Sequence, residues 1–578
     1  MALFAAGAAL WFGVRAVAQQ PARKVDAAQL RRAPAEEWLS YGRDQSETHF
    51  SPLKQIDSAN IARLGLAFAS DLEAPQGNIE GTPIMANGIV YTSLAWGVIS
   101  ATDARTGKFK WRWDPEIPRT GANRPGMCCG AANRGVAIYN GRIYASLIFG
   151  RLVALDAETG KEVWSAQTTD PNTDMTITGA VRVVKGKVIV GTAGAEFGVR
   201  GFFSAYDAET GKQAWKFYTT PGANPETPEL KQAAATWKGT DWSNVPGGGT
   251  VWDGMAYDAD ADLLYIGTGN GSPWNRQFRS PGGGDNLYLC SILAVKPDTG
   301  KLVWYFQTTP GESWDYTSVQ SLLLADLRIN GRNRKVIMQA PKNGFFYVLD
   351  RLTGEFISGK PYTEVNWASG LDAKGRPIEN PGVRYENGTT VEIAPGSGGG
   401  HNWQPMAFSP VTGLVYIPGS VNSRMYHATE SYAPQKGKQL SGVDMNDFAA
   451  GQSPAGARIS NKGTFVKAWD PLTQTARWSV QQAFSAGLLA TAGNLVFVPG
   501  GDGHLVAYSA DKGEKVWEST LIAGISTPIS YQLDNQQYVA VIAGRGGNTP
   551  TRLYTFMLDG KAPMPPAPLP PAAKGKAK

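Results

Sequence analysis

Two adjacent cysteines, Cys128 and Cys129, are the local feature of this sequence that most directly suggests chemistry. As reduced thiols they would be two small buried side chains without a special role. Joined to each other they would close a disulfide ring between neighbouring residues. Ordinary disulfides need Cα atoms further apart than the ~3.8 Å of neighbouring residues, so such a ring is strained. Strain of this kind is typically kept at functional sites, and at this level both interpretations stay open.

The residues that several common catalytic chemistries require are rare in this chain. It contains three cysteines and four histidines, the latter being His49, His401, His427 and His504. A histidine-based metal site or a Ser-His-Asp triad therefore has few residues to draw on. The sequence has no Cys-x-x-Cys-His, so it encodes no site for covalent attachment of a c-type haem. Cys290 is expected to pack as a small hydrophobic side chain.

A short repeat indicates which elements position the functional residues. An alternating apolar strand leads into Asp-x-x-Thr-Gly, and Trp follows eight residues after the Asp. The Gly stands where a tight turn needs a positive φ, and the Trp on the returning strand can pack between neighbouring sheets. The copies run from Asp103 to Trp111, Asp156 to Trp164, Asp207 to Trp215, Lys296 to Trp304, Asp350 to Ser358, Asp470 to Trp478 and Ser509 to Trp517.

Each copy belongs to a unit of about four strands, which is the blade of a β-propeller. The distances between tryptophans are irregular, which indicates degenerate blades and long insertions. Residues 250–271 and 401–419 resemble blade strands without a Trp, and 64–68 could begin another blade. Seven copies and at least one cryptic unit predict an all-β, eight-bladed propeller with tryptophan-docking repeats, with seven blades as the alternative. A closed ring also explains how an all-strand chain can avoid aggregation-prone sheet edges.

Four long polar segments interrupt the repeat, and in a propeller such insertions typically lie on one face and shape a binding site. They are residues 222–249, 271–288, 362–400 and 420–462.

The composition fits one large globular domain. The 578 residues are 42% hydrophobic and 18% charged, which is typical of a packed core rather than of disorder. The net charge of +6 is too dilute for nucleic-acid binding, although it could favour an acidic protein partner.

The two ends of the chain differ from the rest in composition. Residues 1–18 are predicted to be a signal peptide, because an apolar run is followed by Ala-Val-Ala, although no Lys or Arg precedes the run. An uncleaved membrane anchor is the alternative. Residues 19–561 are predicted to form a single propeller domain. The Pro-, Ala- and Lys-rich residues 562–578 are predicted to be a disordered tail.

Six motifs, spread in order between about Trp38 and about Phe556, resemble the quinoprotein alcohol dehydrogenases that use pyrroloquinoline quinone (PQQ). This resemblance covers nearly the whole mature chain and implies an eight-bladed propeller, in agreement with the repeat count. The motifs are Cys-Cys-Gly-Ala-Ala-Asn-Arg134, Gly-Ala-Glu196-Phe-Gly-Val-Arg-Gly, Thr-Gly-Asn270-Gly-Ser-Pro-Trp, Glu-Ser-Trp-Asp315-Tyr, Ala-Pro-Lys342-Asn-Gly-Phe-Phe-Tyr and His-Asn402-Trp403.

The resemblance implies a metal site formed by Glu196, Asn270 and Asp315. Two carboxylates and an amide oxygen are hard oxygen donors, which suit calcium. Family members that use a lanthanide are similar in carrying a second Asp two positions after the catalytic one, where this chain has Thr317. The extra negative charge that a trivalent ion would want is missing, so we predict calcium.

The resemblance also implies how PQQ, a flat tricarboxylate, would be bound. Arg134 and Thr178 resemble carboxylate ligands, and Trp252 resembles the floor on which the quinone stacks. A ring formed by Cys128 and Cys129 would be the opposite wall. The remaining contacts that the resemblance implies are Glu80, the backbone N–H groups of Gly194 and Ala195, Thr250, Lys342, Asn402 and Trp403.

Asp315 and Lys342 are the catalytic residues that the resemblance implies. Asp315 would be the general base that takes the alcohol proton, and calcium beside it would keep its pKa low. Calcium would act as a Lewis acid on the quinone, and Lys342 would stabilise charge as hydride arrives. Because no haem motif is present, we expect a soluble periplasmic cytochrome c to accept the electrons.

The sequence therefore predicts a periplasmic alcohol dehydrogenase of the calcium type, without a fused cytochrome c domain, that forms an aldehyde or ketone. One alternative is a non-enzymatic propeller that acts as a scaffold in the cell envelope. Such a scaffold would not need the implied metal residues and the cysteine pair together. Another alternative is the same cofactor acting on an aldehyde or a sugar alcohol. The alcohol itself is open, and so is the oligomeric state, for which a homodimer is one candidate.

Overall fold

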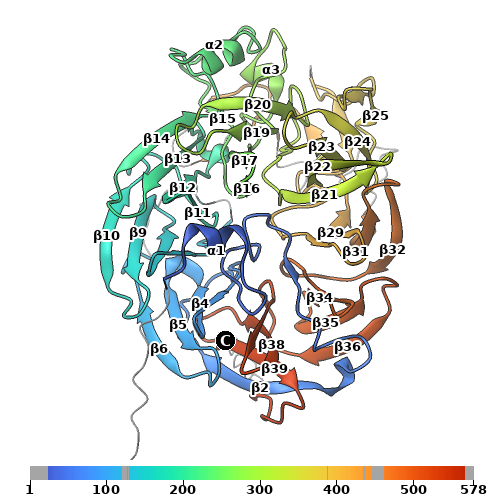
Figure 1. Cartoon of the computed structure of the whole chain (residues 1–578). Helices are drawn as coiled ribbons and strands as arrows, with labels where there is room; N and C mark the ends of the chain where they lie inside the picture. The colour runs from blue at the N-terminus through green and yellow to red at the C-terminus, as the bar shows by residue number, and fades with distance from the viewer. Residues whose placement is uncertain are drawn as a thin grey trace, which may run out of the picture.

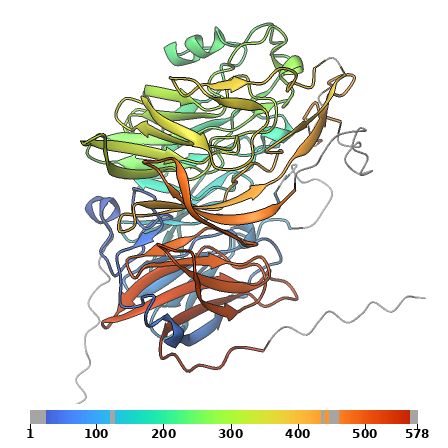
Figure 2. The ribbon, with the colours of Figure 1, turned by 90° about the vertical axis from the view of Figure 1, so that its right-hand side faces the viewer.

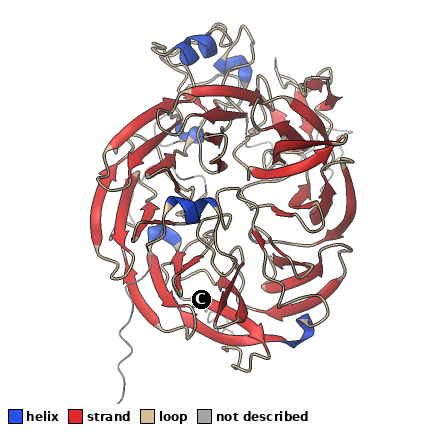
Figure 3. Ribbon diagram, viewed as in Figure 1, coloured by secondary structure: helices blue, strands red, loops and turns tan. Residues whose placement is uncertain are grey.

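Eight antiparallel sheets of at least four strands form a ring around a central axis in the computed structural model of this chain (Figures 1 and 3). The predicted eight-bladed β-propeller is confirmed. The structure describes residues 24–119, 127, 129–386, 388–433, 438–439, 441–444 and 461–566. The predicted signal peptide, Cys128 and most of the predicted tail lie outside these residues. Within the described ranges, no helix combines the length and hydrophobicity needed to cross a bilayer.

Seven blades follow one another along the chain, and each takes its four strands in sequence order from the axis outward. Their strands are, for blade 1, β3 (Ile84–Ala86), β4 (Ile89–Ser93), β5 (Ile99–Asp103) and β6 (Phe109–Trp113); for blade 2, β7 (Ala137–Tyr139), β8 (Arg142–Ser146), β9 (Arg151–Asp156) and β10 (Glu162–Gln167); for blade 3, β11 (Arg182–Val184), β12 (Lys187–Gly191), β13 (Phe202–Asp207) and β14 (Gln213–Tyr218); for blade 4, β16 (Met255–Asp258), β17 (Leu263–Gly267), β19 (Ser291–Val295) and β20 (Leu302–Gln307); for blade 5, β21 (Leu323–Ile329), β22 (Arg332–Gln339), β23 (Phe345–Asp350) and β24 (Phe356–Pro361); for blade 6, β28 (Ala407–Ser409), β29 (Leu414–Val421), β31 (Gly463–Asp470) and β32 (Thr475–Gln481); and for blade 7, β33 (Leu489–Thr491), β34 (Leu495–Pro499), β35 (His504–Ser509) and β36 (Lys515–Thr520).

Short elements supplement the blades. Strand β1 (Phe50–Ser51) pairs in parallel with β33 of blade 7. The helices and two-stranded sheets of the described residues are α1 (Ala27–Arg31), α2 (Pro228–Ala234), α3 (Arg276–Arg279), β15 (Gly247–Gly248) with β18 (Gly271–Ser272), β25 (Ala368–Leu371) with β26 (Pro377–Glu379), and β27 (Thr390–Ile393) with β30 (Arg424–His427).

The eighth blade joins the two ends of the propeller. Its inner strands are β37 (Ile529–Leu533), β38 (Gln536–Ala543) and β39 (Arg552–Leu558), and β2 (Leu64–Asp71) pairs with β39 as the outermost strand. The strand predicted at 64–68 therefore closes the ring.

The other two stretches are blade strands, as predicted, but their blades do carry a Trp, which corrects the second part of the prediction. Residues 250–271 hold β16 and β17 of the blade that ends in Trp304, and residues 401–419 hold β28 and β29 of the blade that ends in Trp478. Insertions separate these strands from their own Trp, so the sequence spacing resembled additional blades.

The repeat tryptophans pack on the turn of the next blade. A Cβ added to Gly160 would lie 2.5 Å from the ring of Trp111, so only glycine leaves room for the indole. Gly160 also has a φ of 72°, and the Trp111 Nε1–H donates to the Ala157 carbonyl oxygen of that turn at 3.1 Å. The same packing joins Trp164 to Gly211, Trp215 to Gly300, Trp304 to Gly354 and Trp478 to Gly513.

The interface between blades 5 and 6 departs from this rule on both sides. Blade 5 has Ser358 where the other repeat copies have Trp, and the facing turn has Gln474 where they have Gly. Gln474 has a φ of 55°, and its Nε2 donates to the Ser358 Oγ at 2.9 Å. The glutamine side chain thus takes the place of the missing indole.

This pairing predicts a compensating double substitution. Ser358→Trp alone is expected to lower the free energy of unfolding by about 1–3 kcal/mol, because the indole would overlap the Gln474 side chain. Adding Gln474→Gly removes that side chain and suits the left-handed backbone, so most of the loss should be recovered. Denaturant unfolding of the wild type, both single variants and the double variant should give a coupling above about 0.5 kcal/mol. Additive effects would show that the two positions are independent.

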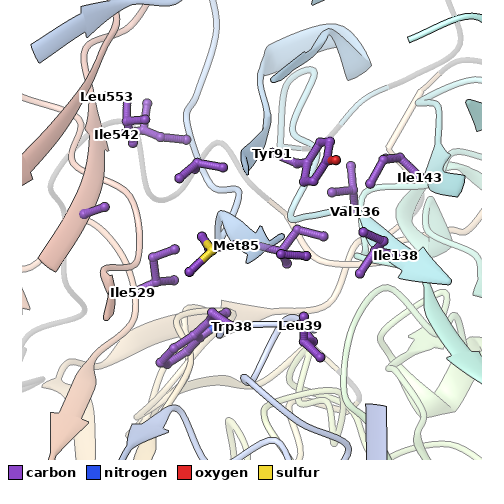
Figure 4. Close-up of a cluster of buried hydrophobic side chains, with 14 of the residues drawn as sticks. Trp38, Leu39, Met85, Tyr91, Val136, Ile138, Ile143, Ile529, Ile542 and Leu553 are labelled. Carbon is purple, nitrogen blue, oxygen red and sulfur yellow. The ribbon is translucent and has the colours of Figure 1, made fainter. Parts of the chain in front are cut away.

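The N-terminal segment contributes to the core near the axis. Trp38 is fully buried, and its backbone N–H donates to the Met85 carbonyl oxygen at 3.0 Å. Figure 4 shows Trp38 and Leu39 beside Met85 of blade 1 and Ile529 of blade 8. This segment therefore joins the first and last blades from inside the ring.

Antiparallel pairing decides on which face each connection lies. The repeat turns join the third and fourth strands of a blade and lie on one face of the disc, which Figure 2 shows edge-on. Connections between the second and third strands, and from one blade to the next, lie on the other face. All four insertions predicted from the sequence are connections of this second kind. They therefore share one face, as predicted.

Candidate functional site

A cavity of about 570 Å³ lies among the connections of the insertion face. Ala195 and Thr250 do not line it, but each is buried close to lining residues in the sequence, and Cys128 lies outside the described residues. The predicted site residues that line the cavity are Glu80, Cys129, Arg134, Thr178, Gly194, Glu196, Trp252, Asn270, Asp315, Lys342, Asn402 and Trp403.

The propeller topology brings these residues together from six blades. One group precedes the first strand of a blade and comprises Glu80, Arg134, Thr178, Trp252, Asp315, Asn402 and Trp403. The other group lies between the second and third strands of a blade and comprises Glu196 in blade 3, Asn270 in blade 4 and Lys342 in blade 5. Because both kinds of connection lie on the same face, residues more than 300 positions apart line one cavity.

Glu196, Asn270 and Asp315 form an acidic group in this cavity. The Asn270 Nδ2 donates to the Glu196 Oε1 at 3.5 Å, and a half-turn of the amide would present its oxygen instead. No group of three or more His, Cys, Asp or Glu side chains that could bind a metal occurs in the described ranges, so a metal at this position would need the amide oxygen as a further ligand. The Asp315 Oδ1 is buried and has no hydrogen-bond partner among the described residues.

Burial is the main reason that the pKa of Asp315 is raised to about 8. Lys342 opposes this rise, and the neighbouring Glu196 carboxylate adds to it. A cation between the two carboxylates would remove the repulsion and satisfy the free oxygen. The donor set and the unpartnered atom therefore fit a hard divalent cation.

Lys342 and Asp315 form a buried ion pair. The Lys342 Nζ donates to the Asp315 Oδ2 at 3.0 Å and to its backbone oxygen at 3.1 Å. Their side chains are only 8% and 11% exposed, respectively. Asp315 has a φ of 66°, an uncommon conformation for a residue with a Cβ. Because Lys342 binds Oδ2, Oδ1 is the oxygen that remains for another ligand.

Arg134 lies beside two indole rings and pairs with two polar side chains in the cavity. Its guanidinium carbon is 5.1 Å from the ring centre of Trp252 and 5.5 Å from that of Trp403. Its Nη1 donates to the Thr178 Oγ1 at 2.7 Å, and Nη2 lies 2.8 Å from a Glu80 carboxylate oxygen. A cation beside two indoles suits a planar ligand that carries carboxylates.

A row of buried charges continues from Arg134 away from the cavity. Asp253 lies 3.9 Å from Arg134 and 3.9 Å from Arg182, and Arg182 pairs with Glu47 at 2.7 Å. Burial raises the pKa of Glu47 to about 7. The charges alternate in sign and connect the cavity to the N-terminal segment. The sequence analysis missed this row, although Asp253 directly follows the predicted Trp252.

Two insertions pack together at the cavity. The Trp274 backbone N–H donates to the Ser441 carbonyl oxygen at 2.8 Å, and the rings of Phe278 and Tyr432 stack with their centres 5.9 Å apart. Trp274 and Gln439 line the cavity from these two segments. The predicted role of insertions in shaping the site is thus visible in particular residues.

Other lining residues were not singled out as site residues from the sequence. Asn78 and Thr176 each precede a predicted residue by two positions, the spacing that keeps extended side chains on one side. The residues missed are Asn78, Met127, Gly130, Ile148, Thr176, Trp274, Ser397, Gly398 and Gln439.

Comparison with known sequences gives matches over most of the chain. The family described as PQQ: Glucose/ethanol/alcohol dehydrogenase, beta-propeller domain, matches residues 38–366 and 439–539. Quinohemoprotein alcohol dehydrogenase ADH IIB of Pseudomonas putida is 52% identical over 564 residues, which are 93% of this chain and 80% of that protein.

Two solved structures of alcohol dehydrogenases also resemble this chain over most of its length. The quinohemoprotein alcohol dehydrogenase ADHIIG from Pseudomonas putida HK5 has a TM-score of 0.87 at 43% identity, covering 95% of this chain and 84% of the other. A europium-containing methanol dehydrogenase has a TM-score of 0.82 at 31% identity, covering 92% of this chain and 100% of the other. With its propeller, its motifs and these relatives, the chain belongs to the family of PQQ-dependent alcohol dehydrogenases.

Proposed function

We propose that this protein oxidises an alcohol to an aldehyde or ketone with PQQ and calcium held in the cavity. The observation that carries this proposal is the buried Asp315 Oδ1, which has no partner among the described residues and lies in a cavity shared with Glu196 and Asn270. When bound, PQQ would accept a hydride and calcium would polarise a quinone carbonyl.

The walls of the cavity match a flat, anionic cofactor. Arg134 and Thr178 would bind one of its carboxylates, and the indoles of Trp252 and Trp403 offer flat surfaces. Thr250 does not line the cavity, but its buried Oγ1 has no partner among the described residues and it lies two positions before Trp252, so we propose it as a further polar contact. We also propose that Cys128 and Cys129 form a disulfide ring, because Cys129 lines this cavity.

Asp315 and Lys342 would have different catalytic roles. Asp315 would take the hydroxyl proton of the alcohol through its carboxylate, in which Lys342 binds Oδ2 and Oδ1 would face both the cation and the alcohol. A nearby cation lowers the pKa of a carboxyl group, so proton transfer would occur together with hydride loss. Lys342 supplies a buried positive charge where negative charge develops.

Calcium is the proposed metal because of residue 317. The fold does not decide the metal, since the europium-containing methanol dehydrogenase shares it. Thr317 lines the cavity but carries no charge, and its hydroxyl exchanges hydrogen bonds with the Gln320 side chain at 2.9 and 3.2 Å. Position 317 therefore does not supply the extra carboxylate that a trivalent ion would want.

Cytochrome c is the proposed electron acceptor, and the periplasm is the proposed location. The 578 residues contain no Cys-x-x-Cys-His, so the accepting haem would lie outside them. The predicted signal peptide at residues 1–18 supports export. Aldehydes and sugar alcohols are the competing substrates.

Reconstitution tests this function. Apoprotein supplied with PQQ and calcium should reduce an artificial electron acceptor in the presence of primary or secondary alcohols. Lanthanum in place of calcium should give clearly less activity. Parallel assays with aldehydes and sugar alcohols separate the substrate classes. A protein that neither binds PQQ nor oxidises any alcohol would refute the proposal and leave the envelope scaffold.

A further inference from the structure

A second carboxylate, that of Glu312, lies directly behind the acidic group of the cavity. It is fully buried and does not line the cavity. Its Oε1 accepts hydrogen bonds from the backbone N–H groups of Trp314 at 2.6 Å and Tyr316 at 3.0 Å. These two N–H groups belong to the residues immediately before and after Asp315. The Glu312 carboxylate therefore fixes the turn that carries Asp315.

The other oxygen of the same carboxylate reaches a different blade connection. The Glu312 Oε2 accepts a hydrogen bond from the Gly271 N–H at 3.1 Å. That N–H belongs to the peptide that joins Gly271 to Asn270. One side chain thus binds the backbone next to two of the three proposed metal ligands.

Asp315 needs such support because of its backbone conformation. Its φ of 66° lies in the left-handed region, which costs energy in a residue other than glycine. This conformation persists only where the surroundings hold it, and the hydrogen bonds to Glu312 on either side do so. Loss of these bonds would allow the carboxylate to leave its position in the cavity.

Arg279 compensates the charge of Glu312. Arg279 is fully buried and donates to the carbonyl oxygens of Pro273 at 2.5 Å and Trp274 at 2.8 Å, and to the backbone oxygen of Glu312. Burial raises the pKa of Glu312, while Arg279 and the three N–H groups oppose this rise. The charge of Arg279 thus offsets that of Glu312 behind the cavity.

We propose that Glu312 is a positioning residue of the metal site, which aligns the backbones of Asn270 and Asp315 so that their side-chain oxygens face one cation. This inference rests on the proposed function, because it assumes that a cation binds there. Glu312 itself touches neither the cation nor the substrate. Its effect passes through three backbone N–H groups.

Calcium titration of the full-length apoprotein by calorimetry tests this role. Glu312→Gln keeps the size of the side chain but replaces one accepting oxygen by an NH₂ group, which repels the N–H that it faces. The Kd for calcium is expected to rise about 10- to 100-fold, the usual effect of losing a side chain that orients metal ligands. At saturating calcium, kcat should stay within several-fold of the wild-type value.

Two further variants make the result decisive. Glu386→Gln is the matched control, since this partly exposed carboxylate pairs with Arg276 at 3.4 Å and does not line the cavity, and its calcium Kd should not change. Glu312→Asp keeps the charge with a shorter reach, and its Kd should lie between those of the wild type and the Gln variant. It decides the question if the Gln variant does not fold.

The outcomes separate this inference from the proposed function. A lower unfolding temperature with an unchanged calcium Kd in the folded variants would make Glu312 a purely structural residue and overturn the inference. A wild-type protein that binds neither calcium nor PQQ would instead overturn the proposed function.

Discussion

Replacing Asp315 by Asn is expected to lower kcat for alcohol oxidation by about 100- to 10,000-fold, the contribution typical of a general base. The amide keeps the shape of the side chain but cannot accept the alcohol proton. PQQ binding, measured by quenching of tryptophan fluorescence, should change much less, because Trp252 and Arg134 remain. Asp326→Asn, at a carboxylate outside the cavity, is the matched control. Retention of more than about a tenth of kcat would exclude Asp315 as the base.

The Asp315→Asn variant should also differ from the wild type in how its stability depends on pH. Without calcium, the pKa of Asp315 is raised from 3.8 to about 8 in the folded protein. The folded state therefore holds this proton more tightly than the unfolded state, and the associated stability is lost as the pH rises through 8. The Asp315→Asn variant has no such loss, because an amide does not titrate in this range, so without calcium it should be more stable than the wild type above pH 8. Thermal unfolding across pH 5–9 measures this difference.

Lys342→Met is expected to have the second large effect. Above about pH 8, where Asp315 is ionised, this change leaves its carboxylate buried without its cation, and breaking a buried pair in this way typically costs about 3–5 kcal/mol. Because calcium would supply part of the missing charge, the loss of stability should shrink when calcium is added. We also expect kcat to fall about 100- to 1,000-fold, because a charge that stabilises the transition state is gone.

The double variant Lys342→Met with Asp315→Asn separates pairing from packing. If the uncompensated carboxylate causes the instability, removing it as well should recover much of the unfolding free energy without restoring kcat. Lys342→Arg keeps the charge and should fold normally with partial activity. Equal instability of the single and double variants would show that the lysine stem, rather than its charge, supports this region.

The sequence predicted the blade count because the docking of Trp on Gly is local and repeats at a fixed offset. It identified blade strands at residues 250–271 and 401–419 but did not connect them to their Trp, because insertions of variable length hide which strand belongs to which Trp. The pairing of β2 with β39 joins residues about 490 positions apart, and no local pattern states it. Similarly, Ser358 and Gln474 look like two unrelated defects until the structure places them in contact.

The cavity residues that carry motifs were predicted, because each motif resembled a family pattern. The buried residues behind the cavity, which hold these side chains in place, were not predicted. Glu312 stands in the same motif as Asp315, but its importance lies in backbone hydrogen bonds that sequence patterns do not display. The row of Asp253, Arg182 and Glu47 combines residues from separate blades and the N-terminal segment, so only the folded chain reveals it.

The closure of the ring by β2 and β39 also sets an order of assembly. Blade 8 lies across the ring from blade 4, which carries Asn270 (Figure 1). The acidic group and Lys342 come from one continuous stretch within blades 3 to 5, residues 182–361, whereas closure waits for residues 552–558. During synthesis, the half of the cavity that holds the proposed metal ligands can therefore form while the ring is still open. The last strand then completes the disc by the long-range pairing that is slowest to find.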